Sequence, residues 1–153
     1  MATLRNTRIA LIACSKLKST NEGAIPAYLR YLRSPLFHLS YLYAKQWGAS
    51  HIYIMSAKYG LIHDGEEIYN YDKTLSKMSR EDRKFWALDI NNKLEEMGRH
   101  GGRVFLVLAG KDYYRDLDLS RLALFGNKVE LPLQGLTQGR RLSWLKQQTQ
   151  GRK

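Results

Sequence analysis

The chain has 153 residues, 44% of them hydrophobic, and a formal net charge of +11, so it is long enough for one domain with a buried core and too short for two. No apolar run approaches the ~20 residues of a membrane span, and the N-terminus lacks the apolar stretch of a signal peptide. The single cysteine, Cys14, excludes an internal disulfide framework, and we therefore expect a reducing, cytoplasmic compartment.

Four segments of the sequence have the pattern of buried strands. Residues 8–14 form an apolar run that ends in small residues, and residues 51–55 and 103–108 repeat this pattern. Residues 128–133 are more weakly strand-like. We expect them at a sheet edge because Pro132 cannot donate to a hydrogen-bond ladder.

Helices are predicted between these strands. The Ser34-Pro35 pair is typical of a helix start, in which a capping hydroxyl precedes a proline, and this helix should end at Gly48. Ser79 resembles the start of a second long helix, which should end at Gly98. The other helical segments are expected at residues 26–33, at 111–125 as a broken helix, and after Gly135 and Gly139 as a basic C-terminal helix.

Strands that alternate with helices indicate βαβ units with right-handed crossovers. We therefore predict one α/β domain over residues 1–153, arranged in three layers, with a mainly parallel sheet of about four strands and helices on both faces. No linker or low-complexity segment divides the chain.

Positive charge is concentrated towards the two ends of the sequence. Residues 1–63 contain eight Lys or Arg and one acid, Glu22, and residues 134–153 contain five Lys or Arg and no acid. If these ends meet in the fold, they form one basic face of the kind that binds nucleic acid or polyphosphate. The alternative is a charged surface that keeps a small protein soluble.

Three of the predicted strands end in the same way. In each, the strand runs into two or three small residues and then a lysine, which is Lys16, Lys58 or Lys111. Ligands of parallel sheets bind beyond the carboxyl ends of the strands, where small residues let them approach backbone N–H groups and lysines meet phosphate charge. We therefore expect one anion-binding crevice, although such residues are also common at ordinary surface turns.

Further residues join this predicted crevice. The segment after the fourth strand offers a helix N-terminus that can receive an anion. Tyr59 and Tyr113 lie just past strand ends, where they would stack on bases or pack against the rim of the sheet. The candidate phosphate-binding residues are Lys16, Lys18, Lys58, Gly110, Lys111, Gly135, Gly139, Arg140 and Arg141.

The candidate catalytic residues are Asp72, Tyr71 and Ser56. Asp72 lies beside tyrosines in the long loop after the second strand, where it would act as a general base or as a nucleophile at a sugar anomeric carbon. Tyr71 or Ser56 would position the sugar. Cys14 follows the first strand beside lysines, and we interpret it as a small buried residue rather than a reactive thiol.

Several established ligand signatures are missing from the sequence. There is no Walker-type phosphate loop and no dinucleotide-binding glycine fingerprint. Cys14 and the four histidines are not spaced as metal ligands. We therefore predict no metal and no cofactor.

Five motifs carry a resemblance to known proteins. They are Cys14-Ser15-Lys16-x-Lys18, Ser34-Pro35-Leu36-Phe37, Ser56-Ala57-Lys58-Tyr59-Gly60-Leu61-Ile62, Tyr71-Asp72-x-x-Leu75 and Leu133-x-Gly135-Leu136-x-x-Gly139-Arg140. In this order, over about residues 8–146, they resemble a family of short bacterial and phage proteins of uncharacterised function, which is distantly similar to the YaaA family of peroxide-stress proteins.

The YaaA resemblance implies a DNA-binding α/β protein. By motif it points to Ser15, Lys16, Ser56, Tyr59, Gly60 and Tyr113 as site residues. The chain is shorter than the YaaA proteins and has Lys58-Tyr59 where they have Leu-Tyr. It lacks room for their additional helical region, so DNA-binding parts of that region are not transferred to it.

Three functional hypotheses follow. The first is a nucleic-acid-associated domain, with DNA preferred over RNA, whose strand-end pocket holds a nucleotide or an extruded base. The second is an N-glycosidase or base-exchange enzyme that acts on a nucleoside or a modified nucleobase. The third is a phage-type protein that binds a host factor. No membrane partner is expected, and the sequence leaves the oligomeric state open.

Overall fold

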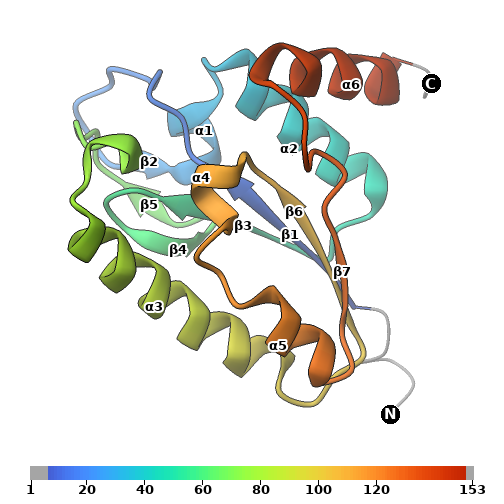
Figure 1. Cartoon of the computed structure of the whole chain (residues 1–153). Coiled ribbons are helices and arrows are strands. Elements are labelled where there is room, and N and C mark those ends of the chain that lie inside the picture. Colours follow the sequence, from blue (N-terminus) through green and yellow to red (C-terminus); the bar gives the residue numbers. More distant parts are fainter. Residues whose placement is uncertain (1–6, 151–153) are drawn as a thin grey trace.

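A computed structural model describes residues 7–150 of the chain (Figure 1). Within that range five strands form the main sheet, in the order β4-β3-β1-β6-β7. β3, β1, β6 and β7 are parallel, and β4 pairs with β3 in an antiparallel hairpin. The strands are β1 (Thr7–Ala13), β3 (His51–Ser56), β4 (Gly60–His63), β6 (Arg103–Leu108) and β7 (Lys128–Glu130).

The predicted α/β class and the mainly parallel sheet are confirmed. The four predicted strands are present, and β7 is at an edge as expected, but it ends at Glu130, so Pro132 lies outside the strand. The sequence analysis missed β4, because it treated Gly60 as part of a strand ending. A small second sheet, in which β2 (Ile25–Pro26) pairs with β5 (Glu67–Ile68), was also not predicted, since two-residue strands carry no periodic signal.

The order of the strands creates a switch point in the sheet. From β1 the chain passes to β3 on one side, and after the β4 hairpin it crosses to β6 on the other side of β1. β1 and β6 therefore lie next to each other while their following connections leave in opposite directions. In open α/β sheets such a switch point is where ligands bind, beyond the carboxyl ends of the strands.

Helices cover both faces of the sheet (Figure 1). Ala10 and Ile12 of β1 pack in one hydrophobic cluster with side chains of α1, α2 and α6. Ile9 and Leu11 point to the opposite face and pack with α3 and α5. The helices are α1 (Ala27–Tyr31), α2 (Pro35–Trp47), α3 (Arg80–Gly98), α4 (Lys111–Tyr114), α5 (Leu119–Leu124), α6 (Gln138–Gln150) and the short 3-10 helix η2 (Leu75–Lys77).

Local signals explain the ends of the two long helices. The Ser34 hydroxyl accepts a hydrogen bond from the Phe37 N–H, and Gly48 ends α2 in the left-handed conformation, at φ 91°. The Ser79 hydroxyl caps α3 by accepting from Asp82 N–H. These boundaries agree with the sequence analysis. α6 starts at Gln138, so Gly139 lies inside the helix rather than before it.

Arg30 holds together the long connection between β1 and α2. Its side chain is fully buried. The guanidinium donates to the backbone carbonyls of Ser19, Asn21, Gly23 and Ile68, at 2.7–3.0 Å. One charged group therefore ties the segment after β1 to β5, and this fixes the path of the chain beside the carboxyl end of β1.

None of the helices in residues 7–150 has both the length and the apolar character needed to span a bilayer.

Candidate functional site: a cavity at the switch point

A cavity of about 640 Å³ opens at the carboxyl ends of β1 and β6. It lies where the strand order predicts a ligand site, and its volume falls within the range of small-molecule pockets. Four parts of the chain line it: residues 13–17 after β1, the first turns of α2, residues 108–113 after β6, and a C-terminal segment with Leu133 and the first turn of α6.

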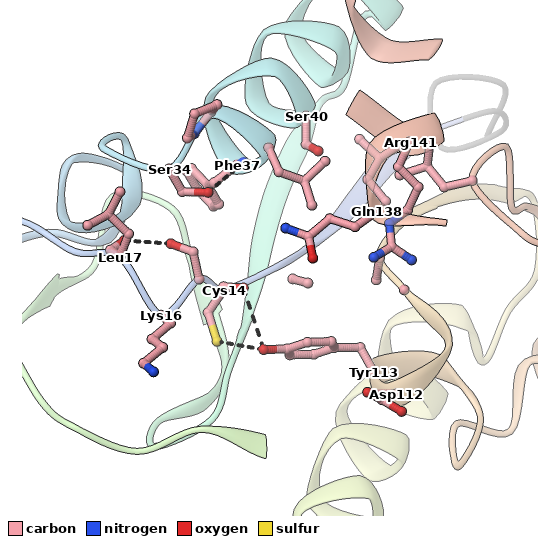
Figure 2. A pocket seen from close by; sticks show the side chains of 18 of the residues that line it. Cys14, Lys16, Leu17, Ser34, Phe37, Ser40, Asp112, Tyr113, Gln138 and Arg141 are labelled. Carbon is pink, nitrogen blue, oxygen red and sulfur yellow. Dashed lines mark hydrogen bonds between the residues drawn. The ribbon is translucent and has the colours of Figure 1, made fainter. Parts of the chain in front are cut away.

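The first turn of α6 contributes two polar side chains. Figure 2 shows Gln138 and Arg141 pointing from α6 towards Cys14 and Tyr113 on the opposite wall. Arg141 donates to the Leu136 carbonyl at 3.3 Å, and its Nε is buried without a hydrogen-bond partner among the described residues. Both side chains therefore offer hydrogen-bonding groups to a ligand in the cavity.

Gly110 leaves the space that the Arg141 guanidinium occupies. A Cβ at this glycine would lie 2.6 Å from Arg141 Nη1. The sequence pattern predicts that small residues at strand ends allow a ligand to approach the backbone. Here the small residue lets an arginine reach the end of β6, so that positive charge lies directly at the cavity wall.

The α2 wall is mostly apolar but also contains the side chain of Ser40. Phe37 and Ser40 are each 2% exposed, and both line the cavity. No hydrogen bond joins the Ser40 hydroxyl to another group among residues 7–150. In Figure 2 this hydroxyl faces the cavity, on the side of Gln138 and Arg141.

Cys14 and Tyr113 form the opposite wall. The tyrosine hydroxyl lies 3.3 Å from Cys14 Sγ (Figure 2), and the Ala57 N–H donates to the same sulfur at 3.4 Å. Burial, with Cys14 next to it, raises the pKa of Tyr113 far above its ordinary value, so the phenol stays protonated. Its ring also meets Trp86 edge-on. The predicted stacking role of Tyr113 thus competes with contacts inside the protein.

Lys16, Lys111 and Ser15 line the cavity as the strand-end pattern and the family resemblance predicted. Both lysines are exposed at its rim. In Figure 2 the Lys16 side chain points away from Gln138 and Arg141. The Ser15 hydroxyl donates to the Leu17 carbonyl at 2.7 Å, which leaves its oxygen lone pairs as acceptors.

Lys58, Tyr59 and Gly60 do not line this cavity. They border a separate pocket of about 370 Å³ together with Trp86. The physical reason is the strand order: β3 lies on the side of β1 away from β6, and the residues after it turn into the β3–β4 hairpin. The expected convergence of Lys58 with the other two strand-end lysines is not seen.

The candidate catalytic residues are placed in two different environments. Ser56 is fully buried, and its hydroxyl lies 3.0 Å from that of Tyr71 and 3.3 Å from that of Tyr31. The two tyrosine hydroxyls are 2.6 Å apart, and burial raises the pKa of both phenols. Asp72 is exposed in the following loop and does not line the cavity.

Lys18 lies against the Tyr71 ring of this group. It is 8% exposed, its Nζ donates to the Lys16 carbonyl at 3.0 Å, and it lies 4.6 Å from the centre of the Tyr71 ring. Burial lowers the pKa of the Lys18 ammonium. Lys18 therefore supports the segment after β1 from within, whereas the sequence analysis placed it at the phosphate.

The remaining candidates lie near the start of α6, outside the cavity lining. Gly135 has φ 80°, so it is needed for a turn, while the Cβ of a residue at Gly139 would meet nothing within 4 Å. Arg140 is exposed. Of the four candidates in this segment, Arg141 is the one whose side chain lines the cavity.

Sequence reasoning missed Ser40, Gln138 and Asp112, all of which line the cavity. Ser40 carried a usable signal, because it is a polar residue on the apolar face of α2, between Phe37 and Ala44. Gln138 and Asp112 carry no such signal, since exposed polar residues at helix starts are common. Among the described residues no group of His, Cys, Asp and Glu forms a metal site.

One known protein family matches nearly the whole of the described chain. The profile of the Family of unknown function (DUF6884) matches residues 9–147, from β1 to α6. The chain belongs to this family. All the residues that line the cavity lie inside the matched segment. No curated protein matches the chain.

Proposed function

We propose that this member of DUF6884 is a nucleic-acid-associated domain, directed at DNA, and that its strand-end cavity receives one nucleotide. The observation that carries the proposal is the cavity at the switch point, which is lined by Lys16, Lys111 and Arg141. Cations at the carboxyl ends of parallel strands are suited to hold phosphate groups.

The lack of internal ion-pair partners for these cations supports the proposal. Lys93, Arg115 and Arg121 each have a carboxylate within 4.0 Å. No such partner lies near Lys16, Lys111 or Arg141 within residues 7–150. Positive charge without an internal partner is what a phosphate backbone neutralises when it binds.

The arrangement of the two basic ends of the chain also supports it. Residues 13–17, the start of α2 and the start of α6 line the same cavity, and α2 packs along α6. The described parts of the two basic segments thus meet, while residues 1–6 and 151–153 lie outside the described range. The sequence motifs that resemble the YaaA family imply the same DNA-directed role, and a reducing cytoplasm suits the single thiol.

An N-glycosidase or base-exchange activity at this cavity is the alternative. Such an enzyme needs a carboxylate at the sugar. Asp112 lines the cavity, whereas Asp72 does not. An activity of this type would therefore be lost in Asp112→Asn and retained in Asp72→Asn, measured as release of free base from oligonucleotides that contain modified bases.

The binding proposal is tested by salt titration of a fluorescent single-stranded oligodeoxynucleotide. Arg141→Ala is compared with Lys146→Ala, which removes an exposed charge from the same helix without touching the cavity. Arg141→Ala should weaken binding about tenfold or more and lower the slope of log K against log salt by about one, because one phosphate contact is lost.

Lys146→Ala should have a clearly smaller effect. Equal effects of the two substitutions would place the binding surface elsewhere. A wild-type protein with no measurable affinity for the oligonucleotide at low salt would refute the proposal.

A further inference from the structure

The cavity holds polar groups that a phosphate site alone does not require. Ser40 is 2% exposed, lines the cavity and has no hydrogen-bond partner within the described part of the chain. Its Oγ is not one of the fully buried polar atoms that lack a partner, so the hydroxyl reaches the open space of the cavity and can hydrogen-bond a ligand there. In Figure 2 the carboxamide of Gln138 lies between this hydroxyl and the Cys14–Tyr113 wall.

These two side chains have complementary hydrogen-bonding capacity. A serine hydroxyl donates one hydrogen bond and accepts two, and a carboxamide presents a donor and an acceptor side by side. Neither of them carries a charge, so they do not select for an anion. They suit a neutral group with donors and acceptors along one edge, which is the character of a nucleobase.

The apolar walls beside these two side chains suit the flat faces of a nucleobase. Phe37, Leu108 and Leu133 are each 2% exposed and line the same cavity. Flat aromatic heterocycles pack their faces against apolar and aromatic side chains while their edges form hydrogen bonds. Arg141 lies one helical turn from Gln138, so a cation for the phosphate adjoins the carboxamide on the same helix face.

We propose that the cavity recognises the nucleobase, with Ser40 and Gln138 selecting the base by its hydrogen-bonding edge and Arg141 holding the phosphate. This inference rests on the proposed function and names its substrate class as a nucleotide read at the base. A site that hydrogen-bonds a base disfavours bases whose edge leaves its polar groups unpaired, so the affinity should depend on base identity.

The experiment measures the affinities of the full chain for the four deoxynucleoside 5′-monophosphates and for deoxyribose 5-phosphate. Gln138→Glu replaces the donor of the carboxamide by an acceptor and should change the order of preference among the four bases, with at least one affinity ratio shifted about tenfold. Gln147→Glu adds the same charge at an exposed position of α6 outside the cavity. It should weaken binding of all four nucleotides slightly and equally.

Two further variants separate base recognition from phosphate binding. Ser40→Ala should weaken the binding of the preferred nucleotide and leave deoxyribose 5-phosphate unaffected. Arg141→Ala should weaken the binding of nucleotides and deoxyribose 5-phosphate alike. A circular dichroism melt of each variant shows that it is folded, which matters for Ser40 because it is buried.

Two outcomes would overturn the inference, and they differ from failure of the proposed function. Base preference that is absent in the wild type, or unchanged in both Gln138→Glu and Ser40→Ala, would reduce the cavity to a sugar-phosphate site while DNA binding stands. If the mononucleotides bind with base preference but an oligodeoxynucleotide neither binds nor competes, the inference is upheld and the DNA-directed function is refuted.

Discussion

Gly110 and Gly139 look alike in the sequence but have different reasons to be glycine. The first lies against the guanidinium of Arg141, and the second has open space where its side chain would be. Both were predicted to belong to the phosphate site. Of the two, Gly110 lines the cavity and lies against Arg141, a contact that no local pattern reveals.

This difference leads to a paired prediction. Gly110 has φ −78°, so alanine is allowed there by the backbone, but its Cβ would displace the flexible Arg141 guanidinium. Gly110→Ala should therefore retain the thermal stability of the wild type while its affinity for an oligodeoxynucleotide falls towards that of Arg141→Ala.

Gly139→Ala is the matched control for this prediction. It should bind like the wild type and be more stable by about 0.5–1 kcal/mol, because alanine is favoured over glycine inside a helix. Fluorescence anisotropy and thermal melts measure both quantities. Wild-type affinity in Gly110→Ala would show that the position of the Arg141 guanidinium is unimportant for binding.

At the scale of elements, α2 connects the fold to the site. Phe37, Ser40 and Ala44 lie on its buried face, and its first turn forms one wall of the cavity. The bounds of α2 could be predicted from the sequence because its cap, its proline and its final glycine are local features. That this face would border a cavity could not be predicted, since it depends on α6 packing alongside.

The Ser34 cap at the start of α2 leads to a second prediction, which concerns stability. The Ser34 hydroxyl accepts from the Phe37 N–H at 3.3 Å and is mostly buried, so no water replaces it freely in Ser34→Ala. This substitution should lower the free energy of unfolding by about 1 kcal/mol, as measured by urea denaturation.

Ser143→Ala is the control for the loss of a hydroxyl from a helix. Ser143 is exposed inside α6 and caps nothing, so this substitution should leave stability unchanged or raise it by a few tenths of a kcal/mol. Two variants of equal stability would mean that the Ser34 cap does not contribute to holding α2.

At the scale of the whole molecule, buried phenols link stability to alkaline pH. Burial raises the pKa of Tyr31, Tyr41, Tyr71 and Tyr113, and in the unfolded chain each would ionise near pH 10. Above that pH the folded state binds more protons than the unfolded state, so these tyrosines make stability fall as pH rises.

Lys18 has the opposite effect on the pH dependence of stability. Because burial lowers its pKa, the unfolded chain binds the extra proton between the lowered value and the ordinary 10.5, and in that window its contribution to stability rises with pH. The contribution of this one lysine is set against the contributions of four tyrosines, which have the opposite sign. We therefore expect the urea midpoint to decline beyond about pH 10, where the tyrosines of the unfolded chain ionise.

The ultraviolet absorbance of phenolate checks this prediction directly. The chain has ten tyrosines. A titration of the folded protein should show fewer phenolates than a titration in urea, and the difference should appear when the protein unfolds. Ionisation of all ten near pH 10 without unfolding would contradict the buried network.

The sequence by itself determined the α/β class, the order of the four parallel strands along the chain and the caps of the two long helices. Apolar periodicity and capping act between residues close together in the chain, so these features are visible locally. Only the tertiary structure decided which strand ends share a cavity. Strand order depends on which edges pair and how the helices cover them. Here the residues after β1 and β6 share one cavity, while Lys58 after β3 borders another pocket. The same packing brings Ser40 of α2 and Gln138 of α6 to one cavity, although nearly a hundred residues separate them.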